Sequence, residues 1–154
     1  MSAKDIRNIV LLGHSGSGKT TLAERMLFLT GGTDRLGKIA DGNTVCDYDP
    51  EEIRRQISIS LAVAPVEYDS CKINVLDVPG GFDFAGEAAE AVQAADAAVI
   101  VCSAKAGISV GAEKAWKYCE KNALPRLIYI SKIDEENSDY NAAFAALRER
   151  FGKN

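Results

Sequence analysis

Short apolar runs alternate along this chain with segments in which apolar residues recur every three or four positions. Several runs are apolar at consecutive positions, which is typical of strands covered on both faces. The runs lie at 8–12, 57–66, 72–77, 97–102 and 126–130. The periodic segments predict helices that pack against such a sheet. The alternation therefore predicts a three-layer, doubly wound α/β domain with a mostly parallel sheet.

The helical spacing also places the ends of some elements. Apolar residues recur at helical intervals within 21–29, 88–95, 112–123 and 140–151, and Ser109 and Ser138 are the expected N-caps of the last two helices. The stretch 31–56 has no clear period and contains several glycines and Pro50. A loop of this length in a compact domain is usually functional, so we expect it to respond to a ligand.

Composition narrows the function classes. The 154 residues suffice for one domain, and 47% hydrophobic with 26% charged residues is ordinary for a globular protein. A net charge of −4 argues against a direct nucleic-acid footprint. Four cysteines without C-x-x-C spacing and a single histidine argue against a zinc site. No signal peptide or membrane-length apolar run is evident, so we expect a cytoplasmic protein with reduced thiols and no membrane partner.

One segment fits the pattern G-x-x-x-x-G-K-[ST] in full. Its residues are Gly13, His14, Ser15, Gly16, Ser17, Gly18, Lys19 and Thr20. An apolar strand precedes it and a helix follows, which disfavours the alternative of a simple glycine-rich turn. Backbone N–H groups up to Thr21 at the helix N-terminus would bind phosphates. Lys19 would reach the β- and γ-phosphates, and the Thr20 hydroxyl would bind Mg²⁺.

A second motif, Asp77-Val78-Pro79-Gly80, closes the strand predicted at 72–77. By itself D-x-P-G is an ordinary turn. After a phosphate-binding loop, however, the Asp77 carboxylate at a strand end could bind Mg²⁺ directly or through water. The Gly80 N–H could reach a γ-phosphate. We therefore expect Asp77 and Gly80 to belong to the same nucleotide site.

A third motif, Ser131-Lys132-Ile133-Asp134, follows the strand predicted at 126–130 and is similar to the guanine-reading motif [NT]-K-x-D. The Asp134 carboxylate can accept hydrogen bonds from guanine N1–H and the N2 amine together. Adenine lacks this donor pair. The stem of Lys132 can lie on the ring. The motif predicts GTP and GDP as ligands.

With three motifs in this order, the chain resembles the N-terminal G domain of translational GTPases, most closely the elongation factor G and elongation-factor-G-like group. The resemblance covers essentially the whole chain and includes the segments 41–45, 47–49, 55–59 and 77–84. It implies a P-loop NTPase fold, GTP hydrolysis with Mg²⁺, and the ribosome as a partner of the full-length protein. It also implies switch I at approximately 31–60, switch II at approximately 78–86, and Ser58 as the magnesium-binding hydroxyl of switch I.

The chain departs from the family at four points. Gly81 stands where the family has a catalytic histidine, Gly16 replaces a phosphate-loop aspartate, and Ser131 replaces an asparagine whose amide could brace the loop. The chain also stops before a further strand and a serine–alanine guanine loop. We therefore expect a partial G domain, residues 1–154, that lacks the last strand and helix. The strand at 126–130 would then be an exposed edge at which chains could self-associate.

The catalytic residue stays open at this point. His14 is a weak candidate, although a side chain packed beside the loop is the favoured interpretation. Arg54 and Arg55 could stabilise the transition state, but a solvated charge pair is the simpler interpretation. Three functions remain: a slow GTPase, a nucleotide-controlled binding switch with negligible hydrolysis, which Gly81 favours, and an ATP-using enzyme, against which Asp134 argues.

Overall fold

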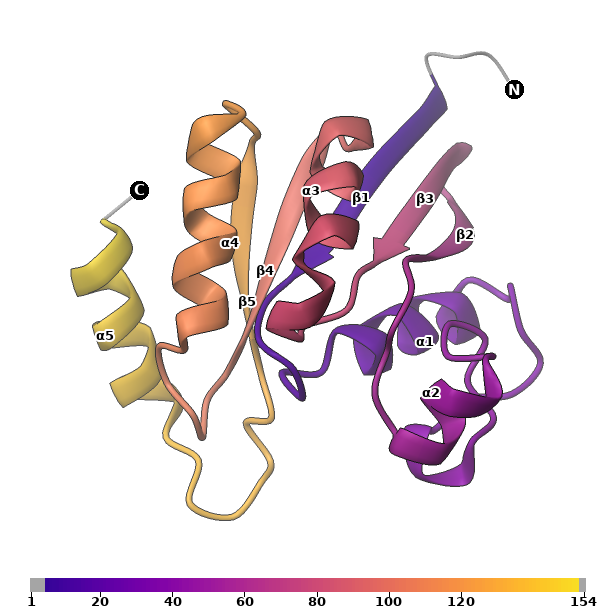
Figure 1. Ribbon diagram of the computed structural model, residues 1–154, viewed down its shortest axis with the longest axis horizontal. Coiled ribbons are helices and arrows are strands. Elements are labelled where there is room, and N and C mark those ends of the chain that lie inside the picture. The colour runs from indigo at the N-terminus through magenta and orange to yellow at the C-terminus, as the bar shows by residue number, and fades with distance from the viewer. Residues whose placement is uncertain (1–4, 153–154) are drawn as a thin grey trace.

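The computed structural model describes residues 5–152 and shows a five-stranded sheet with helices on both faces (Figure 1). The strand order is β2-β3-β1-β4-β5. The strands are β1 (Ile6–Leu12), β2 (Ala62–Tyr68), β3 (Cys71–Asp77), β4 (Ala97–Ser103) and β5 (Arg126–Ser131). All neighbours pair in parallel except β2, which is antiparallel to β3. The predicted doubly wound, mostly parallel α/β fold is confirmed.

Helices cover the two faces unequally (Figure 1). α1 (Lys19–Leu29) packs on one face, and α3 (Ala85–Ala94), α4 (Val110–Lys121) and α5 (Tyr140–Phe151) lie on the other. Successive strand residues point to opposite faces, so Val10 and Leu12 join the core under α3 and α4 while Leu11 joins the core under α1. The consecutive apolar positions in the sequence reflect this double burial.

The strand predicted at 57–66 begins later, at Ala62, and continues to Tyr68. The backbone N–H groups just before it are bonded to side chains instead of to a neighbouring strand. Ile59 and Ser60 donate to Glu52, and Leu61 donates to Glu87 at 2.7 Å. The apolar composition predicted a strand from residue 57, but it could not show that the N–H groups of 59–61 donate to carboxylates.

The stretch 31–56 is not entirely loop, contrary to the prediction. It contains a 3₁₀ turn, η2 (Ile39–Asp41), and a short helix, α2 (Pro50–Arg55). A capping box begins α2, in which Asp49 accepts from the Glu51 N–H and the Glu52 side chain accepts from the Asp49 N–H. A helix of six residues is too short to show a helical period, which is why the pattern missed it.

One of the two predicted helix N-caps is confirmed and the other is wrong. The Ser109 hydroxyl accepts from the Ala112 N–H at 3.2 Å and caps α4 as predicted. The prediction of Ser138 as a cap is wrong, because Asp139 caps α5 by accepting from the Ala142 N–H at 2.9 Å. Ser138 instead donates to the Ile133 carbonyl oxygen.

β5 forms one edge of the sheet, as expected from the sequence, and within residues 5–152 it pairs only with β4. Leu127 and Tyr129 on this strand are 57% and 43% exposed. All four cysteines are free. In the part of the chain that the structure describes, none of the helices combines the length and the apolar character needed to span a bilayer.

Candidate functional site

The glycine-rich loop, residues 13–18, connects β1 to α1 at the carboxyl end of the parallel strands, where doubly wound sheets bind ligands. Gly13 has a φ of 144°, and a Cβ there would collide with the Val101 carbonyl oxygen of β4. Gly18 caps α1 with a φ of 98°. These positions admit only glycine without strain, so the loop shape is fixed by its sequence. Thr21 is exposed in the first turn of α1.

Lys19 is held over this loop. Its Nζ donates to the carbonyl oxygens of Gly13 and His14 at 3.3 and 3.0 Å, and the residue is only 5% exposed. Burial lowers the pKa of Lys19, against the opposing effect of the Asp77 and Asp47 carboxylates. A buried cation of this kind would favour an anionic ligand in the loop.

The structure brings together the three residues predicted to bind a metal, although they come from distant elements. The Thr20 Oγ1 at the start of α1 lies 3.2 Å from the Ser58 Oγ, and Asp77 ends β3 with 1% of its surface exposed. Asp47, which the motifs did not identify, is 4% exposed and interacts with this group. Within residues 5–152, no carboxylate oxygen of Asp47 or Asp77 forms a hydrogen bond of good geometry, although the Ser58 hydroxyl lies near enough to Asp47, and the Thr20 hydroxyl near enough to Asp77, to stabilise the charged form.

These four side chains fit a hard divalent cation. Burial raises the pKa of Asp77 to about 6, against the opposing effects of the Thr20 hydroxyl and the Lys19 ammonium. Burial also raises the pKa of Asp47, against the effect of the Ser58 hydroxyl. Mg²⁺ prefers such oxygen ligands and commonly completes its shell with substrate phosphates and water. No group of three His, Cys, Asp or Glu side chains in residues 5–152 could hold a metal alone, so the hydroxyls and a phosphate would be needed.

Gly80 lies directly against the glycine-rich loop. A Cβ at Gly80 would collide with the Ser15 nitrogen and would lie 2.6 Å from the Lys19 Nζ. The backbone of the turn after β3 therefore reaches the groups that would surround a terminal phosphate. No larger residue fits here without displacing the loop.

The candidates for catalysis occupy less direct positions. Gly81 has φ −75° and ψ 145°, which any residue can adopt, and it offers no side chain. The His14 ring packs against Phe82 with 5.8 Å between centroids. Arg54 and Arg55 both pair with Glu51, and their side chains are 72% and 57% exposed. This arrangement agrees with the interpretation of His14 as a side chain packed beside the loop. It also agrees with the interpretation of Arg54 and Arg55 as solvated charges.

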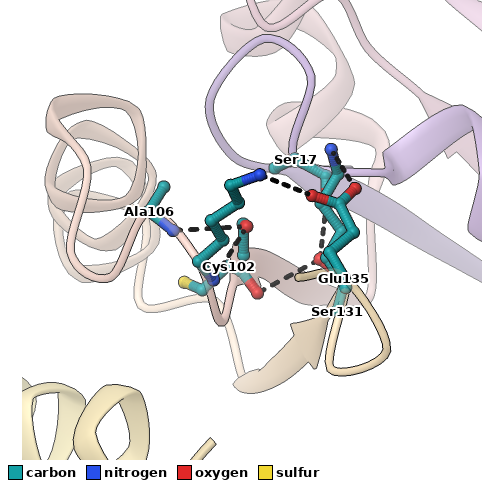
Figure 2. A network of polar contacts seen from close by, with 8 residues as sticks. Ser17, Cys102, Ala106, Ser131 and Glu135 are labelled. Carbon is teal, nitrogen blue, oxygen red and sulfur yellow. Dashed lines mark hydrogen bonds and ion pairs between the residues drawn. The ribbon is translucent and has the colours of Figure 1, made fainter. Parts of the chain in front are cut away.

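Ser131 corrects one expectation. Its hydroxyl donates to the Ser17 carbonyl oxygen at 2.6 Å and lies 3.2 Å from the Cys102 carbonyl oxygen (Figure 2). The sequence predicted that replacing asparagine would lose a brace on the loop. The structure shows that the shorter hydroxyl still braces it, because β5 ends directly beside Ser17.

The remaining base-motif residues border the same region. Lys132 pairs with Glu135 at 3.0 Å, and Lys105 lies 3.7 Å from the other Glu135 oxygen. These two ammonium groups lower the pKa of Glu135, with Lys132 the stronger. Asp134 is exposed in the turn after β5.

Two recesses flank the glycine-rich loop. One is lined by the loop, the β4–α4 connection, Lys132 and Glu135. The other is lined by the loop, Lys19, Thr20, Asp47, Ser58 and Gly80. The glycine-rich loop thus lies between the residues of the guanine motif and the candidate metal ligands. A nucleoside triphosphate would need this arrangement, because its base and its terminal phosphates lie at opposite ends.

Comparison with known proteins decides the family. The family model for the elongation factor Tu GTP binding domain matches residues 4–154. The chain belongs to this family. An elongation factor G-like protein of Mycobacterium tuberculosis (strain ATCC 25618 / H37Rv) is 42% identical over 147 residues, which are 96% of this chain and 21% of the relative.

Two further relatives agree. The mitochondrial ribosome-releasing factor 2 of Anopheles gambiae is 38% identical over 150 residues, covering 97% of this chain and 20% of that protein. A crystal structure from Thermus thermophilus superposes with a TM-score of 0.92 at 42% identity, covering 96% of this chain and 22% of that one. This GTP-binding domain therefore spans about a fifth of the length of its relatives.

Proposed function

We propose that this domain binds GTP and GDP with Mg²⁺ and hydrolyses GTP slowly, as part of an elongation-factor-G-like translational GTPase. The observation that carries the proposal is the group formed by buried Thr20 and Asp77 with half-buried Ser58, beside the buried Lys19. Neither Asp77 oxygen forms a hydrogen bond of good geometry in residues 5–152, and the nearby Thr20 hydroxyl and Lys19 ammonium only partly offset the cost of burying this carboxylate. A cation bound with phosphates would supply that partner.

The residues divide the work of phosphoryl transfer. Backbone N–H groups of the glycine-rich loop and the Lys19 ammonium would bind the β- and γ-phosphates, and the Gly80 N–H would contact the γ-phosphate. Thr20, Ser58 and Asp77 would hold Mg²⁺, which neutralises charge on the phosphates when bound. Asp47 would support the same ion from the 31–60 segment.

Water positioning is the weak part of this site. Hydrolysis requires water in line with the γ-phosphate, and positioning supplies much of the rate in such enzymes. Gly81 has no side chain to orient that water, and the His14 ring packs on Phe82. We therefore expect slow intrinsic hydrolysis.

A second function follows from the same observation about Gly81. The domain would be a nucleotide-controlled binding switch with negligible hydrolysis. Single-turnover hydrolysis, measured with and without ribosomes in the longer protein, separates the two functions. The ribosome is the proposed partner because relatives carry the names elongation factor G-like protein and ribosome-releasing factor.

Guanine selectivity tests the base site. Asp134 lies exposed in the turn after β5, where its carboxylate would accept from both guanine donors. We expect wild type to prefer GTP to ATP in a competition titration. Asp134→Asn should weaken GTP binding and improve binding of xanthosine triphosphate, because the new amide donates where the carboxylate accepted.

Glu136→Gln provides a matched control, since Glu136 is another exposed carboxylate in the same turn. It should leave both affinities unchanged. Equal binding of GTP and ATP by wild type would support an ATP-using enzyme. An unchanged preference in Asp134→Asn would remove Asp134 from the base site.

A further inference from the structure

Two fully buried glutamates lie beside the proposed metal site. Glu24 on α1 is 0% exposed and Glu52 on α2 is 2% exposed. Neither forms a salt bridge within residues 5–152. Buried carboxylates are costly unless their oxygens accept hydrogen bonds, and both residues accept them from backbone N–H groups of the 31–60 segment.

Glu24 holds the segment just before Asp47. Its Oε1 accepts from the N–H groups of Val45 and Cys46 at 2.6 and 3.1 Å. The chain passes so close that a Cβ at Gly37 would collide with the other carboxylate oxygen. Burial raises the pKa of the Cys46 thiol, and the Asp77 and Glu24 carboxylates raise it further, so this thiol stays protonated. The carboxylate thus fixes the two residues that lead into Asp47.

Glu52 holds the segment on the other side. Its Oε2 accepts from the Asp49 N–H at 3.1 Å, and its Oε1 accepts from the Ile59 and Ser60 N–H groups at 2.8 and 3.1 Å. The first bond lies two residues after Asp47. The other two follow Ser58 directly. The capping box of α2 accounts only for the bond from the Asp49 N–H. The bonds from the Ile59 and Ser60 N–H groups tie α2 to the residues that follow Ser58.

We propose that Glu24 and Glu52 are positioning residues that set Asp47 and Ser58 at the metal site before nucleotide binds. This proposal rests on the proposed Mg²⁺–guanine nucleotide site. Glu24 fixes the backbone ahead of Asp47, and Glu52 fixes it behind both Asp47 and Ser58. Hydrogen bonds to ionised acceptors are stronger than neutral ones, so the two carboxylates would lower the entropy cost of ordering the segment around the ion.

The decisive variant is Glu52→Gln, with Glu24→Gln as a milder partner. An amide keeps one acceptor oxygen and loses the other, so Glu52→Gln must break bonds at Asp49 or at Ile59 and Ser60. Glu24→Gln can keep its bonds and loses only their charge assistance. Glu51→Gln is the control for the Mg²⁺ dependence, because Glu51 is a half-exposed carboxylate on the same helix whose pairs with Arg54 and Arg55 lie away from the backbone bonds of Glu52.

The first readout is the Mg²⁺ concentration at which a non-hydrolysable GTP analogue reaches half-maximal binding. We expect Glu52→Gln to raise it about tenfold, which is the loss of one charge-assisted hydrogen bond, and Glu24→Gln to raise it less. GDP binding without Mg²⁺ should change less than about twofold in every variant, since the carboxylates act on the metal side of the loop. Glu51→Gln should match wild type.

The second readout is tryptic cleavage after Arg54 and Arg55 in the nucleotide-free chain, where both side chains are exposed. It should be several-fold faster in Glu52→Gln than in wild type, with an unchanged rate at arginines outside the 31–60 segment. This readout needs no nucleotide. If wild type binds no guanine nucleotide, the proposed function fails, while cleavage still reports whether the carboxylates hold the segment.

Unchanged Mg²⁺ dependence and unchanged cleavage in Glu52→Gln would overturn the proposal. So would equal losses of GDP and GTP-analogue binding, because these would mean that the residue only maintains the fold. If Glu52→Gln does not fold, as judged by thermal melting, Glu24→Gln decides the question. A wild-type Mg²⁺ dependence in that folded variant overturns the role of Glu24.

Discussion

The glycine-rich loop and the 31–60 segment border the same site but are held by different forces. The loop is fixed by backbone sterics, since a Cβ at Gly13 would collide with the Val101 carbonyl oxygen and a Cβ at Gly111 of α4 would lie 2.7 Å from the His14 nitrogen. The 31–60 segment is held chiefly by the Glu24 and Glu52 carboxylates, which accept hydrogen bonds from backbone N–H groups of the segment. The backbone of the glycine-rich loop is thus restricted by steric contacts, whereas the 31–60 segment is held by individual hydrogen bonds.

This difference has consequences for motion. Close packing resists small displacements and has few intermediate states. Individual hydrogen bonds contribute about 1 kcal/mol each and can break one at a time. We therefore expect the glycine-rich loop to be the more rigid region without nucleotide. The 31–60 segment should open more readily, to an extent that the hydrogen bonds to Glu24 and Glu52 limit. Single substitutions in the glycine-rich loop should therefore cause large losses of stability and nucleotide binding. Single substitutions in the 31–60 segment should cause smaller ones.

Gly13→Ala should have the largest effect. The new Cβ collides with the Val101 carbonyl oxygen at a φ of 144°, so we expect a loss of about 3 kcal/mol or more in the free energy of unfolding and no measurable nucleotide binding. Urea unfolding and nucleotide titration measure both.

Gly86→Ala is the matched control for Gly13→Ala. Gly86 lies in α3 with open space around a Cβ, so the change should stabilise the chain by up to about 1 kcal/mol. A folded Gly13→Ala chain that binds GTP normally would refute the steric account of the loop.

Asp77→Asn should change stability and nucleotide binding in opposite directions. Asp77 lies between the glycine-rich loop and the 31–60 segment. Asp77 has a pKa of about 6 in the folded chain against 3.8 as the ordinary value. The folded chain binds the extra proton between these values, so wild-type stability falls as pH rises through this window. Without metal at pH 7, the variant should be more stable by up to about 3 kcal/mol.

That gain should disappear as pH falls toward about 4, where the wild-type carboxyl is neutral too. Mg²⁺-dependent GTP binding should weaken in Asp77→Asn at the same time. Asp83→Asn, at an exposed carboxylate nearby, should change neither quantity. Unfolding curves across pH check the first effect, and a variant less stable than wild type at pH 7 would contradict it.

Gly81→His should raise GTP hydrolysis by about tenfold, or about 1.4 kcal/mol in the barrier. The backbone at Gly81 accepts any residue, and a Cβ would lie 3.2 Å from the Phe84 ring, which must shift slightly. Single-turnover assays with and without ribosomes measure the rate. A wild-type parent that already hydrolyses GTP as fast as ordinary elongation factor G on ribosomes would show that the histidine is dispensable.

Gln56→Gly should have the smallest effect. Gln56 ends α2 with a φ of 56°, which glycine adopts without strain. We expect a gain of about 0.5 kcal/mol in the free energy of unfolding, measured by urea titration. Gln56→Ala keeps the strained backbone and should give no such gain, and equal stabilities of the two variants would mean that this residue stores no strain.

Some features of this protein were determined by sequence alone. The apolar runs specified the strands, of which β4 is the most completely buried while β2 and β5 expose alternate residues. The motifs at 13–20, 77–80 and 131–134 each lie at a strand end as predicted. Ser109 was recognisable as a cap because capping depends on neighbours within about four residues. These features are local, so spacing along the chain is enough to predict them.

Only the tertiary structure decided how the site is assembled. Ser131 braces Ser17 across 114 positions, and Asp47 joins Thr20 and Asp77 because the 31–60 segment folds back over α1. Glu24 and Glu52 have no motif that marks them. Their partners are backbone N–H groups, which every residue except proline carries, so the sequence could not single out the donors. The tertiary fold decides which donors these are, because it places the N–H groups of the 31–60 segment beside the Glu24 and Glu52 carboxylates.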